Sequence, residues 1–273
     1  MIFEIKISNA EEPYNVQPGL CVIINNTNFK QGTDLPGGDE DEQGLFKLFF
    51  SLRFEVKIHR NLTANEMVHK VESYSKLQHR GAFFLIILSH GTMVEDKEVI
   101  IGTDGKTVTV NNIESFFHIN KCPTLNKIPK IFLIDACRGN RLERAYFEPQ
   151  SHDTSRLVPR GAGQNPSDRR VAKLDTSDFL LVYASTHGHV AYSTSGGSRL
   201  TQTFIEVTKE AADDKTITEI IREVKARVQE HGQQMVESVD RLPREYFIKR
   251  YMLLCTYRYS FVTDLTYCFH FAL

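Results

Sequence analysis

Short apolar runs alternate along the chain with stretches in which apolar residues recur at helical spacing. Five runs are apolar almost throughout, at residues 19–26, 82–91, 130–135, 178–186 and 251–261. Such runs are typical of strands that are buried on both faces of a parallel sheet. A sixth strand is predicted over residues 54–60, where Phe54, Val56 and Ile58 alternate with polar residues.

Helices are predicted between the strands. Residues 37–52 begin with acidic residues, which favour a helix N-terminus, and then place apolar residues on one face. Thr63 with Glu66, and Thr216 with Glu219, each have the spacing of a capping box that opens a further helix. Alternating strands and helices predict an α/β fold, with a mostly parallel six-stranded sheet and helices on both faces.

One segment interrupts this pattern. Residues 149–173 are rich in proline, glycine, serine and arginine, and they lack hydrophobic periodicity. Segments of this kind are typical of exposed linkers that proteases cut. The sequence therefore predicts two parts of one sheet, a large part over residues 1–148 and a small part over residues 174–273, joined by a cleavable linker.

Composition and charge exclude several classes of function. The 273 residues are 41% hydrophobic and 25% charged, with a formal net charge of -1. This balance is ordinary for a globular protein and gives no reason to expect binding to nucleic acid or to an acidic membrane surface. No apolar run approaches the roughly 20 residues that a membrane span needs. The N-terminal residues lack the apolar core of a signal peptide.

The five cysteines are widely spaced and odd in number, and they include no Cys-x-x-Cys pair. This usage predicts a reducing compartment, the cytoplasm, with most of the thiols buried. His187 and His189 have the spacing of half a metal site, but no further cluster of cysteine or histidine accompanies them. We therefore expect no metal and no organic cofactor.

Two reactive residues of complementary type follow apolar strands. His90 comes after one strand and Cys137 after another, and the carboxyl ends of parallel strands gather at one edge of a sheet. A cysteine nucleophile needs a base, because the thiolate is the attacking species, and histidine titrates near neutral pH. Main-chain N–H groups around Gly91 and Cys137 would complete the site as an oxyanion hole. The residues thus predict a Cys–His catalytic dyad.

The motifs around this dyad resemble those of the caspase family of cysteine peptidases. The family signature places a histidine roughly 50 residues before the cysteine, and His90 precedes Cys137 by 47 residues. "GLCVIINNTNF", "GGDEDEQGLFKLFF" and "YAST" resemble the first strand, the first helix and the first strand of the small subunit of that family. The resemblance implies the caspase fold, a cysteine endopeptidase matured from a zymogen by cleavage between its subunits, and a role in programmed cell death.

The chain departs from the caspase pattern where caspases bind the aspartate of their substrates. The family uses two arginines and a glutamine there, and the corresponding positions in this chain are Leu35, Ser193 and Asp135. Paracaspases and metacaspases, which prefer arginine or lysine, resemble this chain in a D-x-C motif, and Asp41 aligns with a second acidic residue of theirs. The resemblance implies a pocket for a basic substrate residue, lined by Asp135 and Asp41.

The substrate itself is expected to be a protein or peptide. It would lie extended beside residues 190–194, adding a strand through hydrogen bonds to the main chain around Ala191, Tyr192 and Ser193. The predicted site of maturation is Arg160 in the "LVPRG" of the linker. By resemblance, the strand at residues 251–261 would meet its mate across a twofold axis, which predicts a homodimer of large–small units.

Two other interpretations are compatible with the sequence. In the first, Asp135 pairs with Arg138 or with a cation of a loop, Arg199 supplies the missing positive charge, and the chain is a conventional Asp-specific caspase. The linker aspartates, among them Asp153, are compatible with that interpretation. In the second, the chain is a pseudoenzyme, a regulatory scaffold whose substrate pocket has decayed.

Overall fold

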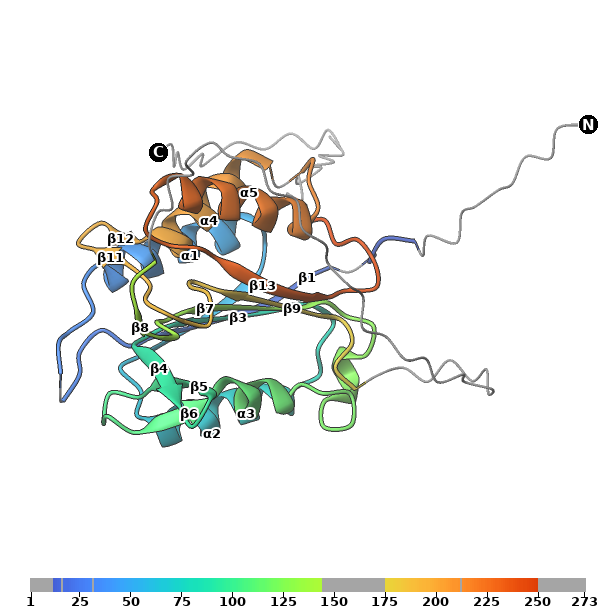
Figure 1. Cartoon of the computed structure of the whole chain (residues 1–273). Helices are drawn as coiled ribbons and strands as arrows, with labels where there is room; N and C mark the ends of the chain where they lie inside the picture. The colour runs from blue at the N-terminus through green and yellow to red at the C-terminus, as the bar shows by residue number, and fades with distance from the viewer. Residues whose placement is uncertain (1–11, 16, 31, 144–174, 212, 250–273) are drawn as a thin grey trace, which may run out of the picture.

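The elements of the structure, a computed structural model, follow one another largely as the hydrophobic pattern predicts (Figure 1). The structure describes residues 12–15, 17–30, 32–143, 175–211 and 213–249. The strands of the main sheet are β1 (Gln17–Asn25), β2 (Glu55–Arg60), β3 (Gly81–Leu88), β7 (Lys130–Asp135), β9 (Phe179–Tyr183) and β13 (Glu237–Arg241). The α-helices are α1 (Gly38–Ser51), α2 (Ala64–Ser75), α3 (Val110–Ser115), α4 (Arg199–Ala211) and α5 (Ile217–Glu230).

The six strands form one sheet in the order β13-β9-β7-β3-β1-β2. Five of them run parallel, and β13 pairs antiparallel with β9 at one edge. This arrangement confirms the predicted α/β class with its mostly parallel six-stranded sheet. It also places the carboxyl ends of β3 and β7 side by side, at the edge of the sheet where ligands gather in folds of this kind.

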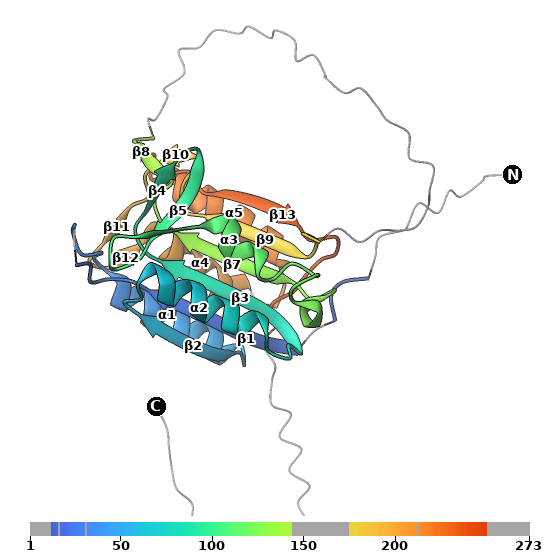
Figure 2. The same cartoon turned by 90° about the horizontal axis from the view of Figure 1, so that it is seen from below.

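A hydrophobic core covers each face of the sheet. α1, α4 and α5 pack on one face, where Phe49 and Phe204 are buried. Figure 2 shows α2 and α3 lying across the other face, where Phe83 and Phe117 are stacked against each other. The central strands are buried on both sides as a result, which is why their sequences are apolar throughout.

Both predicted capping boxes are formed in the structure. In α2 the Thr63 hydroxyl accepts from the N–H of Glu66, whose carboxylate accepts from the N–H of Thr63. Thr216 and Glu219 form the same reciprocal pair at the start of α5. These bonds satisfy main-chain donors that a helix N-terminus otherwise leaves without partners.

Three small sheets lie near the carboxyl edge of the main sheet. β4 (Gly91–Val94), β5 (Lys97–Ile101) and β6 (Thr107–Thr109) form the first of them. In the second, β8 (Gly139–Arg141) pairs with β10 (Gly188–His189), and in the third, β11 (Ser193–Thr194) pairs with β12 (Gly197–Ser198). In these two sheets, β8 follows the predicted catalytic cysteine, β10 precedes the predicted substrate segment at residues 190–194, and β11 forms its end.

The sixth strand of the main sheet is not the one that the apolar pattern predicted. That position is occupied by β13, whose sequence is ESVDR, while residues 251–261 lie outside the described residues. β13 is an edge strand with half-buried and exposed side chains, so it has no need of an apolar sequence. The linker, including Arg160, also lies outside the described residues.

Within the described ranges, none of the helices combines the length and the hydrophobicity that crossing a bilayer requires.

Candidate active site

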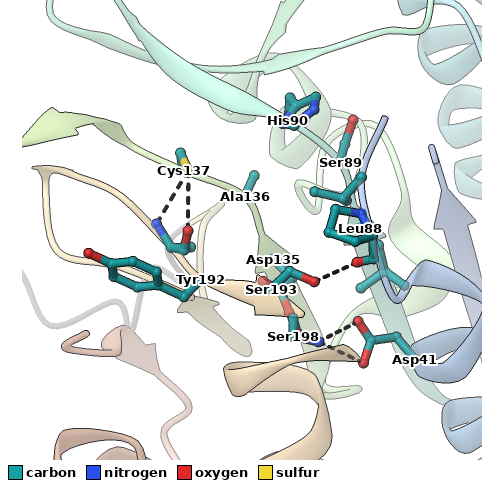
Figure 3. A pocket seen from close by; sticks show the side chains of 13 residues that line it. Asp41, Leu88, Ser89, His90, Asp135, Ala136, Cys137, Tyr192, Ser193 and Ser198 are labelled. Carbon is teal, nitrogen blue, oxygen red and sulfur yellow. Dashed lines mark hydrogen bonds between the residues drawn. The ribbon is translucent and has the colours of Figure 1, made fainter. Parts of the chain in front are cut away.

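Cys137 and His90 follow two neighbouring strands. β3 and β7 pair in parallel with Leu88 opposite Asp135, so the residues that come next emerge at the same edge of the sheet. His90 lies two residues beyond the end of β3, and Cys137 lies two residues beyond the end of β7. The structure thus brings the two predicted catalytic side chains to one region (Figure 3).

A cavity of about 160 Å³ opens between these strand ends, the loop before α1 and the segment after β10. His90 and Cys137 both line it, and so do all the residues predicted from the sequence to bind substrate: Leu35, Asp41, Asp135, Ala191, Tyr192 and Ser193. Figure 3 shows Asp135, Ser198 and Asp41 together on the side of the cavity away from His90.

The ring of His90 is held by two neighbours. Its Nε2 lies 2.8 Å from the carbonyl oxygen of Thr33. Because a carbonyl oxygen only accepts, Nε2 carries the proton, which leaves Nδ1 of the neutral ring as the acceptor. The ring also packs against Phe29, with 4.6 Å between the ring centroids. His90 therefore presents an acceptor nitrogen in a defined orientation.

The thiol of Cys137 is half-buried beside the main chain of Ala191. The N–H of Ala191 donates to Sγ at 3.3 Å, and Sγ lies 3.7 Å from the carbonyl oxygen of the same residue. Burial raises the pKa of the Cys137 thiol; the N–H of Ala191 lowers it, and the nearby Asp135 raises it further. The raised pKa favours the neutral thiol, so a base would have to remove its proton before the sulfur could act as a nucleophile.

Gly91 brings two stretches of main chain into contact. A Cβ at this position would lie 2.5 Å from the carbonyl oxygen of Cys137 and 2.9 Å from the Cβ of Ala136. Real side chains do not tolerate such distances, so only glycine permits this approach. The main chain of Gly91 therefore lies directly against that of Cys137.

Asp135 is the last residue of β7, and only 6% of it is exposed. Its Oδ2 accepts hydrogen bonds from the hydroxyl of Ser198 and, at 2.6 Å, from the hydroxyl of Thr201. Both donors sit at the start of α4, where the helix dipole favours a negative charge. Burial raises the pKa of Asp135, and the two hydroxyls act in the opposite direction.

Asp41 lies in the first turn of α1, and only 2% of it is exposed. The N–H of Ser198 donates to both of its oxygens, at 3.1 and 2.9 Å, and the amide of Gln202 donates to Oδ1 at 2.7 Å. Burial and the charge of Asp135 raise the pKa of Asp41 to about 7. Ser198 thus links the two carboxyl groups, through its main chain to Asp41 and through its side chain to Asp135.

The two arginines considered from the sequence do not reach these carboxyl groups. Arg138 binds Glu98 and, at 2.6 Å, Glu237. Arg199 donates to Gln233 at 3.0 Å and does not line the cavity. Among the described residues, those that line the cavity include no lysine or arginine. The pairing of Asp135 with Arg138 is therefore wrong, and the positive charge expected from Arg199 lies outside the cavity.

Comparison with known proteins identifies the family. Residues 18–247 match the sequence model of the caspase domain, which covers well over half of the chain. The chain belongs to the caspase family. This caspase is 31% identical over 229 residues to caspase-3 of Bos taurus, an alignment that covers 81% of this chain and 77% of that protein.

A second relative is aligned over a smaller share of its length. The chain is 34% identical over 195 residues to caspase-8 of Mus musculus, which covers 65% of this chain and 38% of the relative. The chain therefore spans well under half the length of mouse caspase-8. As a member of the family, it is a cysteine-type endopeptidase that acts on proteins or peptides.

Three residues that position the site of this caspase were missed in the sequence: Thr33, Ser198 and Thr201. Ser198 had a signal, because serine is a favoured N-cap residue: it stands directly before α4, and its hydroxyl accepts from the N–H of Thr201 at 3.0 Å. Thr33 had none, since it contributes a carbonyl oxygen, which every residue carries.

The structure places the two histidines of the possible metal site differently. Nδ1 of His189 lies 3.0 Å from the hydroxyl of Thr186, and His187 is exposed. Within the ranges that the structure describes, no group of three or more His, Cys, Asp or Glu side chains is arranged to hold a metal ion.

Proposed function

We propose that this chain cleaves peptide bonds with Cys137 as nucleophile and His90 as general base. Nδ1 of His90, left as the acceptor by the bond from Nε2 to Thr33, takes the thiol proton as sulfur attacks the scissile carbonyl carbon. The protonated ring then gives that proton to the leaving amine, and water hydrolyses the thioester. The N–H groups of Gly91 and Cys137, whose main chains are in contact, would hold the oxyanion.

The cavity is proposed to take an arginine or lysine side chain, the P1 residue before the scissile bond. The observation that carries this proposal is the pair of buried carboxyl groups, Asp135 and Asp41, in a cavity whose described lining has no cation. A substrate carboxylate about 4 Å from Asp135 would be repelled by about 4 kcal/mol at an effective dielectric near 20. A guanidinium in the same place would gain charge-assisted hydrogen bonds.

Turnover of matched fluorogenic tetrapeptides tests this specificity. The chain should cut peptides that end in arginine or lysine and should cut the aspartate-ending peptide at least about a hundredfold more slowly, as judged by kcat/KM. Cys137→Ala should abolish all of this turnover and serves as the blank. Preferential cleavage after aspartate would contradict the basic pocket, and no cleavage of any peptide would favour the pseudoenzyme.

A variant pair assigns the preference to the cavity. Asp135→Asn should lower kcat/KM for the arginine peptide by about 10- to 100-fold, because a hydrogen bond to a charged group is lost. Asp39→Asn removes an exposed carboxylate from the first turn of α1, the turn that also carries Asp41, and should leave that preference in place. Equal effects of the two substitutions would mean that net charge, and not the cavity, sets the specificity.

Maturation by cleavage of the linker remains part of this proposal. It divides the chain into a large part (residues 1–148), a linker (residues 149–173) and a small part (residues 174–273), with Arg160 as the cleavage site. The proposal draws on the arginines of the linker sequence and on the basic specificity proposed above. Mass spectrometry of the self-processed chain should find new termini after arginine or lysine, and termini only after aspartate would contradict the basic pocket.

The cellular setting is proposed from the family alone. Caspase-family membership supports a role in programmed cell death in the cytoplasm and a homodimer of large–small units. β13 rather than residues 251–261 is the strand that would meet the second copy, because it forms the edge of the main sheet among the described residues.

A further inference from the structure

Gln234 is a buried polar side chain that lies outside the cavity. It stands between α5 and β13, and only 3% of it is exposed. The segment that carries it is fixed in place, because Val236 is buried in the hydrophobic core and Glu237 begins β13 opposite Tyr183. A buried amide needs hydrogen-bond partners within the protein, so the partners of Gln234 indicate its role.

The amide of Gln234 bonds two stretches of main chain. Its Oε1 accepts from the N–H of Tyr192 at 2.9 Å, and its Nε2 donates to the carbonyl oxygen of Ala184 at 2.8 Å. A main-chain N–H only donates and a carbonyl oxygen only accepts, so these two partners fix the orientation of the amide. Ala184 is itself tied to the main sheet, since its N–H donates to the carbonyl oxygen of Ile134 in β7 at 3.0 Å. Gln234 therefore connects the main chain of Tyr192 to the main sheet.

Tyr192 belongs to the segment along which the substrate is proposed to lie, and adjacent N–H groups of this segment have different partners. The N–H of Ala191 donates to Sγ of Cys137 at 3.3 Å, and both of these residues line the cavity. The N–H of the next residue, Tyr192, donates to Gln234, which does not line it. This is the alternation that an extended chain produces. The bond to Gln234 thus holds the segment from behind, directly beside the residue that contacts the thiol.

We propose that Gln234 is a positioning residue, which holds the main chain of residues 191–193 against Cys137 so that a substrate strand can pair with it. This inference rests on the proposed function for the path of the substrate. Loss of the amide would leave the N–H of Tyr192 and the carbonyl oxygen of Ala184 in need of new partners, and the segment would shift to satisfy them. The N–H of Ala191 and the main chain that pairs with the substrate would move with it.

The length of the peptide provides the first measurement. The reporter amide of acetyl-Leu-Val-Pro-Arg, the sequence of residues 157–160, can pair along the segment, whereas that of acetyl-Arg is too short to do so. Gln234→Met replaces the amide with an apolar side chain of similar length and removes both bonds. It should lower the ratio of kcat/KM for the tetrapeptide to that for acetyl-Arg by about tenfold, with most of the loss in KM. A variant that was merely less stable would lose both activities equally and keep the ratio.

Alkylation of Cys137 by iodoacetamide provides a second measurement, which needs no substrate. The N–H of Ala191 favours the thiolate, so its displacement in Gln234→Met should move the midpoint of the pH dependence of alkylation to higher pH. Mass spectrometry of the peptide that contains Cys137 follows the reaction at this thiol alone. The other titratable side chains that line the cavity are unchanged by the substitution: Asp41, His90, Asp135 and Tyr192.

Gln229→Met is the matched control. It removes an exposed glutamine from the last turn of α5 and should leave both the ratio and the midpoint as they are in the unaltered chain. An unchanged ratio or an unchanged midpoint in Gln234→Met would overturn the proposal. If only aspartate-ending peptides are cut, the basic pocket fails, but acetyl-Leu-Val-Pro-Asp and acetyl-Asp give the same comparison. If no peptide is cut, or the unaltered chain does not prefer the tetrapeptide, the proposed path of the substrate fails, and the midpoint alone decides for or against Gln234.

Discussion

Asp41 and Asp135 determine the proposed specificity, and both are buried. Burial alone would favour neutral carboxyl groups, which would attract a basic side chain only weakly. Each one, however, lies in the first turn of a helix or against it, and each accepts hydrogen bonds from Ser198. These donors favour the charged form, and a substrate cation in the cavity would favour it further. The pair is therefore able to ionise when its ligand arrives.

This balance makes the specificity depend on pH. The pKa of Asp41 is raised to about 7, so the group is largely neutral below that pH and charged above it. The preference for arginine over its uncharged isostere citrulline should therefore increase as pH rises through about 7. The ratio of kcat/KM for the two peptides is the appropriate measure, because titration of the catalytic pair cancels in it.

Asp41→Asn provides the control for this prediction. The amide does not titrate, so the arginine/citrulline ratio should lose its rise near pH 7 and remain low. The exposed Asp39→Asn should keep the rise. A rise of equal size in Asp41→Asn would assign it to another group, and a flat ratio in the unaltered chain would contradict the shifted pKa.

At the scale of elements, the hairpin of β11 and β12 closes the cavity over the two carboxyl groups. Its close approach to α1 depends on two glycines. Gly37 has φ of +77° and lies against the main chain of the hairpin, and Gly197 has φ of +108°. A Cβ at Gly197 would overlap Oδ1 of Asp41. The hairpin can donate to Asp41 only because these positions carry no side chain.

Gly197→Ala should therefore damage the pocket and leave most of the fold intact. The strained φ and the overlap with Asp41 should push β12 away, lowering kcat/KM for arginine peptides by about tenfold or more, for a strain of roughly 1–3 kcal/mol. Gly196→Ala is the matched control, since a Cβ there meets nothing nearer than 3.7 Å. Equal kinetics for the two variants would show that the hairpin does not position Asp41.

The elements also show how far the sequence could predict this fold. The buried strands and both capping boxes were predictable, because apolar runs and the Thr-x-x-Glu spacing reflect forces that act locally. β13 was not predictable, because an edge strand needs only one buried face and the apolar residues of ESVDR do not recur at strand spacing. β10, β11 and β12 have two residues each, too few to show any periodicity. Their pairing is set by tertiary contacts.

The site divides in the same way. Cys137, His90, Asp135 and Asp41 were found because reactive or charged residues at strand ends and motif positions are conspicuous in a sequence. The orientation of these side chains could not be predicted, because the carbonyl oxygen of Thr33 and the main chain of Ala191 carry no residue-specific signal.

At the scale of the whole molecule, the large and small parts share one sheet and both cores. β7 of the large part pairs with β9 of the small part. Lys130 and Asp178 form a fully buried ion pair between the two parts, with 4.0 Å between Nζ and Oδ2. The hydroxyl of Tyr14 donates to the other oxygen of Asp178 at 2.6 Å. Cutting the linker should therefore leave the two parts associated.

Lys130→Met should strongly lower the free energy of unfolding. It leaves Asp178 as a buried charge without its cation, which typically costs about 3–5 kcal/mol. Chemical denaturation of the Cys137→Ala chain measures the effect, and adding Asp178→Asn should recover part of the loss. Lys57→Met breaks an exposed pair with Glu55 and should leave the unfolding midpoint nearly unchanged. A small effect of Lys130→Met would mean that packing alone holds the two parts together.

The edge formed by β13 carries the last prediction. An antiparallel pairing of two copies about Val239 would place Glu237 of one copy opposite Arg241 of the second copy, so the charges of the strand are complementary to themselves. Val239 is 41% exposed at the centre of this strand.

Val239→Lys would place two like charges at the twofold axis and should convert a dimer into a monomer. Light scattering should then give 31.3 kDa for Val239→Lys and twice that mass for the unaltered chain. Val94→Lys, which changes a similarly exposed valine in β4, should also give the mass of the dimer. A dimer that survives Val239→Lys would place its interface elsewhere, and an unaltered chain that is monomeric at micromolar concentration would refute the twofold arrangement.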